Sequence, residues 1–161
     1  DGATLGEITV RGNVVMKGYY NDAEATAAAI KNGWFHSGDA AVVHPNGYVE
    51  IRDRFKDVII SGGENVSSIE VEGCLLTHTA VQEVAVVGMP HEKWGESPHA
   101  FVVVQAGLEV SEDELKSHVR ENLAHFKTPQ WVSFVEELPK TATGKVQKFM
   151  LRDGQSGISR Q

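Results

Sequence analysis

The sequence predicts an α+β protein in two parts, a small β-rich section followed by a compact α+β domain. Short segments that alternate polar and apolar residues, separated by glycine-containing turns, occupy residues 1–53. After residues 53–57 the pattern changes, and strand patterns are interleaved with helical ones. A hydrophobic content of 41% in 161 residues is sufficient for a folded core. We therefore divide the chain into regions 1–53 and 54–161.

The first region is expected to contain four strands and one helix. Residues 6–12 alternate polar and apolar side chains, and residues 14–16 are the apolar run expected to pair with them. Asn21-Asp22 offers an N-cap for an alanine-rich helix over 23–30, which Asn32-Gly33 would end. Strands over 40–43 and 47–51 follow, joined by a turn at 44–47.

The second region is expected to alternate strands and helices. A strand over 58–60 runs into a glycine-rich turn at 61–65 and a helix at 67–76. Strands over 81–87 and 99–104 precede a helix over 112–124, for which Ser111 and Glu114 form a capping-box pair. A strand over 131–135, a loop and a short C-terminal helix complete the region. Residues from about 153 to 161 are expected to form a flexible tail.

Composition excludes several classes of function. The formal net charge of -7 argues against a nucleic-acid partner, which needs clustered basic residues. No apolar run reaches the roughly 18 residues of a transmembrane segment, and no signal peptide is recognisable. Cys74 is the single cysteine, so no internal disulfide can form, which favours a cytoplasmic location. We interpret Cys74 as a core residue, because it lies beside Leu75 on the predicted helix.

Lys145 is the strongest candidate for chemistry. It ends the loop 139–145, and Gly144 directly before it allows backbone conformations that would aim its ammonium into a site for an anion. A Walker A phosphate loop needs glycine five residues before the Gly-Lys pair and Ser or Thr after it. Pro139 and Val146 occupy those positions, so the sequence excludes that loop.

Three glycine-containing clusters, at 34–39, 53–65 and 139–145, occur in an order that resembles a known family. Their sequences and spacing are similar to those of the AMP-forming acyl-CoA synthetases, in the adenylate-forming superfamily that also includes firefly luciferase and peptide-synthetase adenylation domains. Shorter matches at 6–8, 18–20 and 88–90 extend the resemblance over nearly the whole chain. The overall pattern is most similar to fatty or medium-chain acyl-CoA ligases.

The resemblance implies a division of the fold. Region 1–53 would be the end of a large N-terminal AMP-binding domain, and region 54–161 the mobile C-terminal lid domain. The upstream part of such an enzyme would hold a Ser/Thr/Gly-rich phosphate loop and the acyl pocket. The chain is thus expected to be a fragment that is inert alone and works with its missing N-terminal domain.

The resemblance also implies residues that bind the nucleotide. Asp39 would accept hydrogen bonds from both ribose hydroxyls of ATP or the acyl-adenylate, and Arg54 would reach the ribose or phosphate. Ser37 stands where the family usually has Thr, and Asp53 where it usually has Gly. Lys56 would be the hinge about which the lid domain rotates, at a position where Asp is more familiar.

Coenzyme A and the reacting phosphate would be contacted by the lid. Gly62, Gly63 and Glu64 would line the pantetheine tunnel, and Phe126 and Lys127 would stack on or neutralise the CoA nucleotide. Lys145 would contact the carboxylate and the α-phosphate during adenylation. Mg²⁺ would arrive with ATP, since the seven histidines show no metal-binding spacing and no protein metal site is expected.

The expected reaction converts a carboxylate, ATP and CoA to acyl-CoA, AMP and pyrophosphate through an acyl-adenylate. Two alternatives share the motifs: an adenylation domain that loads a carrier protein, and a non-catalytic nucleotide-binding module. Acylation of Lys145 would be a way to regulate the first step.

Overall fold

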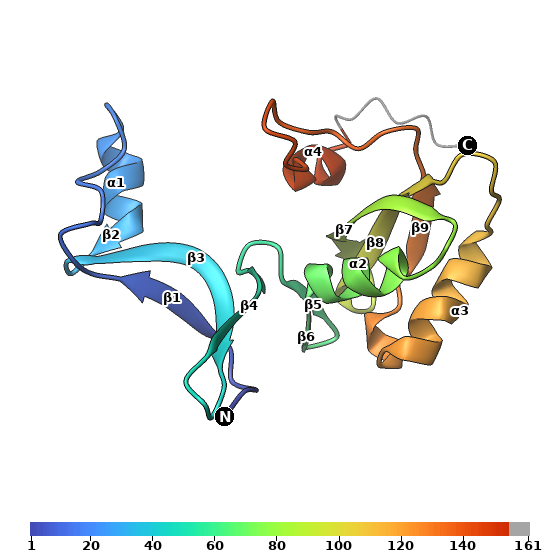
Figure 1. The fold of residues 1–161 in the computed structure, drawn as a ribbon, viewed down its shortest axis with the longest axis horizontal. Helices are drawn as coiled ribbons and strands as arrows, with labels where there is room; N and C mark the ends of the chain where they lie inside the picture. The colour runs from blue at the N-terminus through green and yellow to red at the C-terminus, as the bar shows by residue number, and fades with distance from the viewer. Residues whose placement is uncertain (155–161) are drawn as a thin grey trace. The chain divides into compact units, whose positions relative to one another are not determined.

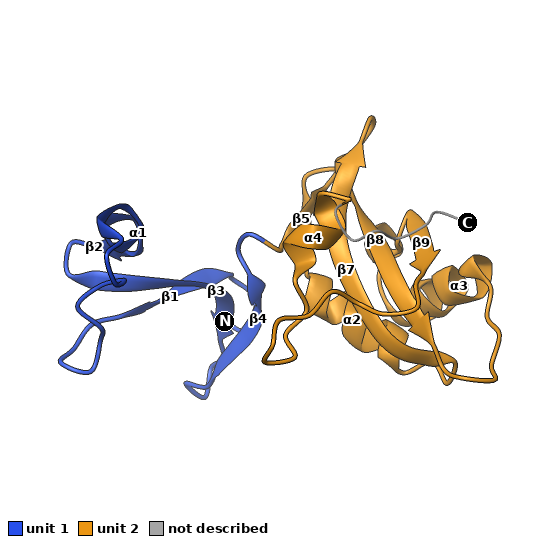
Figure 2. Ribbon diagram, turned by 90° about the horizontal axis from the view of Figure 1, so that it is seen from above, with its two compact units in different colours: residues 1–56 blue, residues 57–161 orange. Residues whose placement is uncertain are grey.

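A computed structural model describes residues 1–154 and divides the chain into two compact units. Unit 1 comprises Asp1–Lys56, and unit 2 begins at Asp57 (Figure 2). Each unit has its own sheet, so each is described by itself. The tail predicted for residues 153–161 lies, from residue 155 on, outside the described residues.

Unit 1 is an antiparallel sheet with one short helix. The central strand is β3 (Trp34–Val43), which pairs with β1 (Gly6–Val10), β2 (Ile30–Lys31) and β4 (Val49–Arg54) (Figure 1). Helix α1 (Ala23–Ala29) begins after Asp22, whose carboxylate accepts a hydrogen bond from the Ala25 N–H at 2.9 Å. The predicted helix and its N-cap are confirmed.

Two expectations for unit 1 are wrong. Residues 14–16 form no strand; Val14 is exposed, and the chain there turns back on Gly12 through the Val15 N–H. β1 pairs with β3 instead, because β3 is a ten-residue strand that can pair along the whole of β1. Asn32-Gly33 does not end the helix either. Both residues have positive φ, 53° and 79°, and form the two-residue turn between β2 and β3.

Unit 2 is a five-stranded sheet in which a long hairpin dominates. Strands β7 (Val81–His91) and β8 (Gly95–Val104) pair antiparallel, and β9 (Trp131–Phe134) pairs parallel with β8. The small hairpin of β5 (Ile59–Ser61) and β6 (Glu64–Val66) joins β8 through Ser61 and Gly95, on the edge that β9 also pairs with further along the strand. The β7–β8 hairpin extends through residues 88–98, which the sequence analysis left between its two strands.

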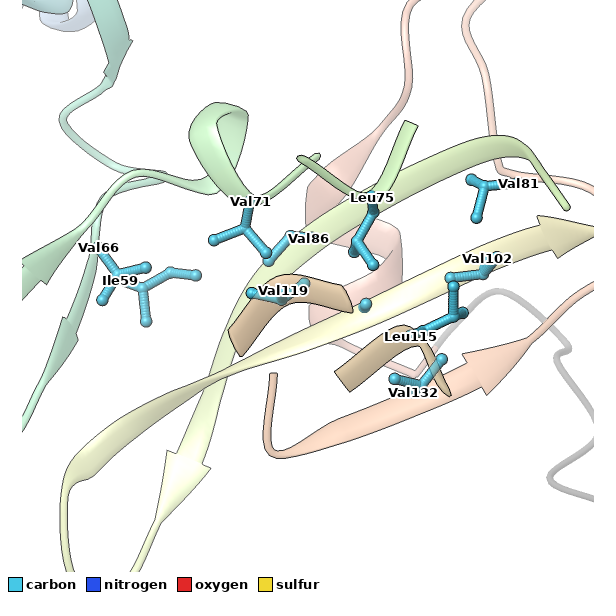
Figure 3. Close-up of a cluster of buried hydrophobic side chains, with 11 residues drawn as sticks. Ile59, Val66, Val71, Leu75, Val81, Val86, Val102, Leu115, Val119 and Val132 are labelled. Atoms are coloured by element: carbon cyan, nitrogen blue, oxygen red, sulfur yellow. The ribbon is translucent and has the colours of Figure 1, made fainter. Parts of the chain in front are cut away.

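Helices cover one face of this sheet and enclose the larger core. Helix α2 (Ser68–Leu76) contributes Val71 and Leu75, and α3 (Glu112–Asn122) contributes Leu115 and Val119 (Figure 3). The predicted capping box of Ser111 and Glu114 is present at the start of α3. Cys74 packs against this core as predicted, and burial raises the pKa of its thiol.

A second, smaller core lies on the opposite face. Neighbouring residues of a strand point to opposite sides, so Val86 faces the first core while Val87 faces the second. Leu138 and Leu151 pack here, and Leu151 belongs to the short helix α4 (Lys148–Arg152). The segment with Lys145 therefore runs between two buried leucines. No helix among the described residues is long and apolar enough to cross a membrane.

Candidate functional site

Asp39 and Arg54 lie opposite each other in unit 1. They form a register pair between β3 and β4, and Arg54 Nε is 3.5 Å from Asp39 Oδ1. The Asp39 side chain is about half as exposed as that of Arg54, at 28% against 57%. Strand pairing thus brings together the two residues that the sequence assigned to nucleotide binding. Together they present a carboxylate and a guanidinium, which can hydrogen-bond a vicinal diol and a phosphate.

The backbone before Asp39 is fixed by hydrogen bonds from several directions. Gly38 has a φ of 74°, and its N–H donates to Glu7 Oε1 at 3.1 Å. Its carbonyl accepts from the Phe55 N–H at 2.9 Å. The Asp39 N–H donates to Ser37 Oγ at 3.1 Å, so the hydroxyl kept by Ser37 has a local structural role.

Glu7 is a residue that the sequence analysis did not single out. Its Oε2 lies 2.6 Å from His36 Nδ1, while its Oε1 holds the Gly38 amide. The hydrogen bond with His36 is the main cause that lowers the pKa of Glu7 below its usual range. Glu7 could have been identified only if the pairing of β1 with β3 had been predicted, because this pairing places its carboxylate beside a histidine 29 residues away.

Lys56 lies in the turn between β4 and β5 and is exposed, in agreement with a charged, solvated connection. It is the last residue of unit 1, and Asp57, the first residue of unit 2, is buried.

Gly62 and Gly63 form the two-residue turn of the β5–β6 hairpin. Their φ angles are 61° and 88°, values that favour glycine, and Ser61 pairs with Glu64 across the turn. The Gly62 N–H donates to the Trp94 carbonyl at 2.9 Å, and a Cβ on Gly62 would lie 2.9 Å from Trp94 Cε3. Both glycines and Glu64 are exposed, so a ligand can approach the backbone closely at this turn.

Phe126 and Lys127 lie in a 3₁₀ turn, η1 (His125–Lys127), with different surroundings. The Phe126 ring is exposed and is available for stacking. Lys127 Nζ lies 2.7 Å from both carboxylate oxygens of Glu70 on α2. The lysine predicted to neutralise a nucleotide thus already has a carboxylate partner, and it connects η1 to α2.

Lys145 follows a tightly hydrogen-bonded turn. Lys140 and Val146 form an isolated antiparallel bridge, and the Thr141 N–H donates to the Lys145 carbonyl at 2.8 Å. The Gly144 N–H donates to the Thr141 carbonyl at 2.9 Å, and Gly144 has a φ of 83°. We call residues 140–146 the Lys145 hairpin. Lys145 is exposed, and within residues 1–154 its ammonium has no ion-pair partner.

The predicted residues are therefore divided between the two units. Asp39, Arg54 and Lys56 belong to unit 1, while the Gly62–Gly63 turn and the Lys145 hairpin belong to unit 2. No group of metal-ligating side chains that could hold an ion occurs in the described part of the chain. A surface pocket beside α3 contains none of the predicted residues; it is lined by His78, Asp113, Glu114, Ser117, His118 and Glu121.

Comparison with known proteins identifies relatives of this chain. The chain is 54% identical to a peroxisomal butyrate–CoA ligase of Arabidopsis thaliana and 53% identical to a peroxisomal trans-cinnamate:CoA ligase of Petunia hybrida, over 95% of its length in both. It spans only 27% of the length of each relative.

A solved structure gives the same result for the fold. The o-succinylbenzoate CoA synthetase of Bacillus subtilis, in complex with its acyl-adenylate intermediate, matches 99% of the chain with a TM-score of 0.87 and 38% identity. The chain covers 32% of that protein. Residues 70–145 match the sequence profile of the AMP-binding enzyme C-terminal domain. These residues thus match the AMP-binding enzyme C-terminal domain family, and the relatives of the chain named above are CoA ligases.

Proposed function

We propose that this chain is the C-terminal portion of an AMP-forming acid–thiol ligase, an acyl-CoA synthetase. In the first half-reaction a carboxylate oxygen attacks the α-phosphorus of ATP, and pyrophosphate leaves. In the second, the thiol of CoA loses its proton and attacks the acyl carbonyl, and AMP leaves. The CoA ligases with at least 53% identity to the chain support this assignment.

One observation carries the proposal: Lys145 is an exposed lysine without an ion-pair partner in the described chain, held at the end of a closed hairpin. Such a cation can be brought to a phosphate without first breaking an ion pair. A fixed positive charge stabilises the charge that develops on the α-phosphate and the attacking carboxylate. We assign Lys145 this role in adenylate formation.

The other predicted residues would bind the two cofactors. Asp39 would accept hydrogen bonds from the ribose hydroxyls, and Arg54 at 3.5 Å from it would contact the ribose or phosphate. The exposed Gly62–Gly63 turn, with Glu64 beside it, would line the path of the pantetheine arm. Phe126 would stack on the CoA nucleotide, with Lys127 adjacent. Mg²⁺ would enter with ATP.

Lys56 would act as the hinge that separates the two half-reactions. Asp39 and Arg54 serve the nucleotide, whereas Lys145 and the Gly62–Gly63 turn serve successive steps from one compact unit. Rotation about the exposed turn at Lys56 would present one or the other of these unit 2 elements to the reacting atoms.

The acyl substrate is not encoded in this region. Ligases named for cinnamate and for butyrate resemble the chain equally well, at 53% and 54% identity. An aromatic acid and a short aliphatic acid need different pockets. Our assignment of a fatty or medium-chain acid therefore stays a prediction, to be tested with the N-terminal domain present. The cytoplasmic location likewise stays a prediction.

Lys145→Ala in the enzyme that carries this chain tests the proposal. We expect the rate of adenylate formation, measured as pyrophosphate release, to fall by roughly 10²- to 10³-fold, the effect of removing one fixed electrostatic group. Acyl-CoA formation from supplied acyl-adenylate should change by less than about twofold, well under the tenfold that 1.4 kcal/mol represents.

Lys116→Ala is the matched control, because Lys116 lies on α3 and is paired with Glu112. It should leave both half-reactions intact. Equal loss of both half-reactions in Lys145→Ala would contradict the assigned role.

Replacing CoA with a phosphopantetheinyl carrier protein tests the carrier-loading alternative. Tight binding of AMP to the chain alone, measured by calorimetry, would favour a nucleotide-binding module.

A further inference from the structure

Both ends of the Lys145 hairpin are attached to the rest of unit 2 by ion pairs. At the start, Lys140 Nζ lies 2.6 Å from a carboxylate oxygen of Glu83 on β7. Just after the hairpin, Lys148 Nζ lies 2.8 Å from Glu72 and donates to Ser68 Oγ at 2.6 Å, both on α2. The hairpin is thus fixed to two separate elements.

A third ion pair connects α4, the helix after the hairpin, to the segment that follows the proposed hinge. Arg152, the last residue of α4, donates from Nη2 to Asp57 Oδ1 at 2.6 Å. The pair is well protected from solvent, with 11% of the Asp57 side chain and 27% of the Arg152 side chain exposed. The partners are 95 residues apart in sequence, and Asp57 directly follows Lys56.

Helix α4 depends on such contacts for its position. It has five residues, far fewer than an isolated helix needs to be stable in water. Leu151 is buried in the second core, and the side chains of Lys148 and Arg152 provide the polar anchors. Because α4 begins three residues after Lys145, the position of α4 restricts where the chain leaves the Lys145 hairpin.

We propose that Asp57 and Arg152 are positioning residues for Lys145. Their ion pair ties the first residue of unit 2 to the helix that follows the Lys145 hairpin. Rotation about Lys56 then carries the hairpin as a fixed part of unit 2, and the lysine arrives at the α-phosphate in one orientation. The inference rests on the function proposed above, since it needs Lys145 to act in adenylate formation.

Arg152→Gln in the enzyme that carries this chain is the main test. Loss of the ion pair should lower kcat for adenylate formation by about 10- to 100-fold, because small misplacements of a reacting group have effects of this size. The KM for ATP and the rate of acyl-CoA formation from supplied acyl-adenylate should change by less than about twofold, since nothing that binds ATP or CoA is removed.

Two further variants separate positioning from stability. Arg152→Lys keeps the positive charge and should recover most of the adenylation rate, while Asp57→Asn should reproduce the loss. Lys116→Gln removes an ion pair of the same unit on α3, away from the hairpin, and should leave the adenylation rate unchanged. Circular dichroism of every variant establishes that unit 2 is folded.

Backbone amide NMR of the chain itself reports the conformation of the Lys145 hairpin independently of the reaction. In Arg152→Gln the amide signals of Thr141, Gly144 and Lys145 should shift, whereas in Lys116→Gln they should not. Unchanged hairpin signals, or equal loss of both half-reactions in the enzyme, would overturn the positioning role. A wild-type enzyme that forms no adenylate while the hairpin signals shift would overturn the proposed function instead.

Discussion

Two lysines that were predicted to bind anions, Lys127 and Lys145, differ in what already surrounds them. The ammonium of Lys127 contacts both oxygens of Glu70, so binding a phosphate there requires this ion pair to be broken or shared. Lys145 has no such competitor in the described chain. From residue type and loop context alone, the two lysines are equally good candidates for binding an anion. The ion pair of Lys127 with Glu70 makes Lys145 the better candidate.

A second prediction for a single residue concerns the titration of Glu7. Its pKa is lowered, first by the hydrogen bond with His36 and also by the Gly38 N–H. A group whose folded pKa is lowered stabilises the folded state above its unfolded pKa, and this contribution disappears as pH falls through the folded pKa. The Gly38 amide signal of the chain should therefore shift with a midpoint below about 4.3, the value of an unperturbed glutamate.

Glu7→Gln provides the control for this titration. Glutamine keeps an oxygen that can accept from the Gly38 N–H but has no acidic group, so the low-pH step should vanish while the amide stays hydrogen-bonded. The His36 signals report the same pair from the other side. A Gly38 midpoint at or above 4.3 in the unmodified chain would mean that Glu7 does not hold this peptide.

The β5–β6 hairpin gives a prediction at the scale of an element. Both turn glycines have positive φ, but only Gly62 lies under Trp94, whereas a Cβ on Gly63 would meet open space. Gly63→Ala should thus lower the free energy of unfolding by about 1–2 kcal/mol, the cost of a left-handed alanine. Gly62→Ala should cost more, because the indole must also move.

Urea unfolding of the chain, followed by circular dichroism, measures this difference. Gly63→Asn is the matched control, since asparagine tolerates the left-handed region and should cost less than alanine at the same position. Equal effects of alanine at both positions would show that Trp94 does not restrict Gly62.

Elements defined by local signals were predictable from the sequence. The N-cap Asp22 and the capping box of Ser111 and Glu114 depend on side chains within a few residues of the helix start, and both are present. The partner of β1 was not predictable in this way. Residues 14–16 were closer in sequence, but β3 offers a ten-residue strand, and the choice depends on long-range pairing.

The residues of the candidate site also differ in whether a local sequence signal marks them. Glycine-containing motifs marked Asp39, the Gly62–Gly63 turn and Lys145, because unusual backbone conformations leave a signal in the sequence. Ion pairs leave none when their members are 57 or 95 residues apart, as in Lys127–Glu70 and Arg152–Asp57. Sequence analysis therefore missed the residues that we propose to position Lys145, and the roles of Asp39, the Gly62–Gly63 turn and Lys145 stay predictions.

At the scale of the whole molecule, the division into two units separates Asp39 and Arg54, proposed to bind the nucleotide, from the two unit 2 elements proposed to serve the successive steps. Unit 1 ends at Lys56, and the cores of unit 2 are built from residues after Asp57. The domain boundary expected at 53–54 stays a prediction about the parent enzyme. A hinge at Lys56 requires that the backbone there change its dihedral angles while both cores stay intact.

Lys56→Pro tests this requirement, because proline fixes φ near -65° and removes the rotation that a hinge needs. In the enzyme that carries this chain, one half-reaction should fall by at least about tenfold, a barrier increase of roughly 1.4 kcal/mol, while the other stays within about twofold. Pyrophosphate release and acyl-CoA formation from supplied acyl-adenylate measure the two separately. Lys56→Ala leaves φ free and should preserve both, since the side chain is exposed. A proline variant that retains both half-reactions would exclude Lys56 as the pivot, because a fixed φ cannot accommodate two orientations of unit 2.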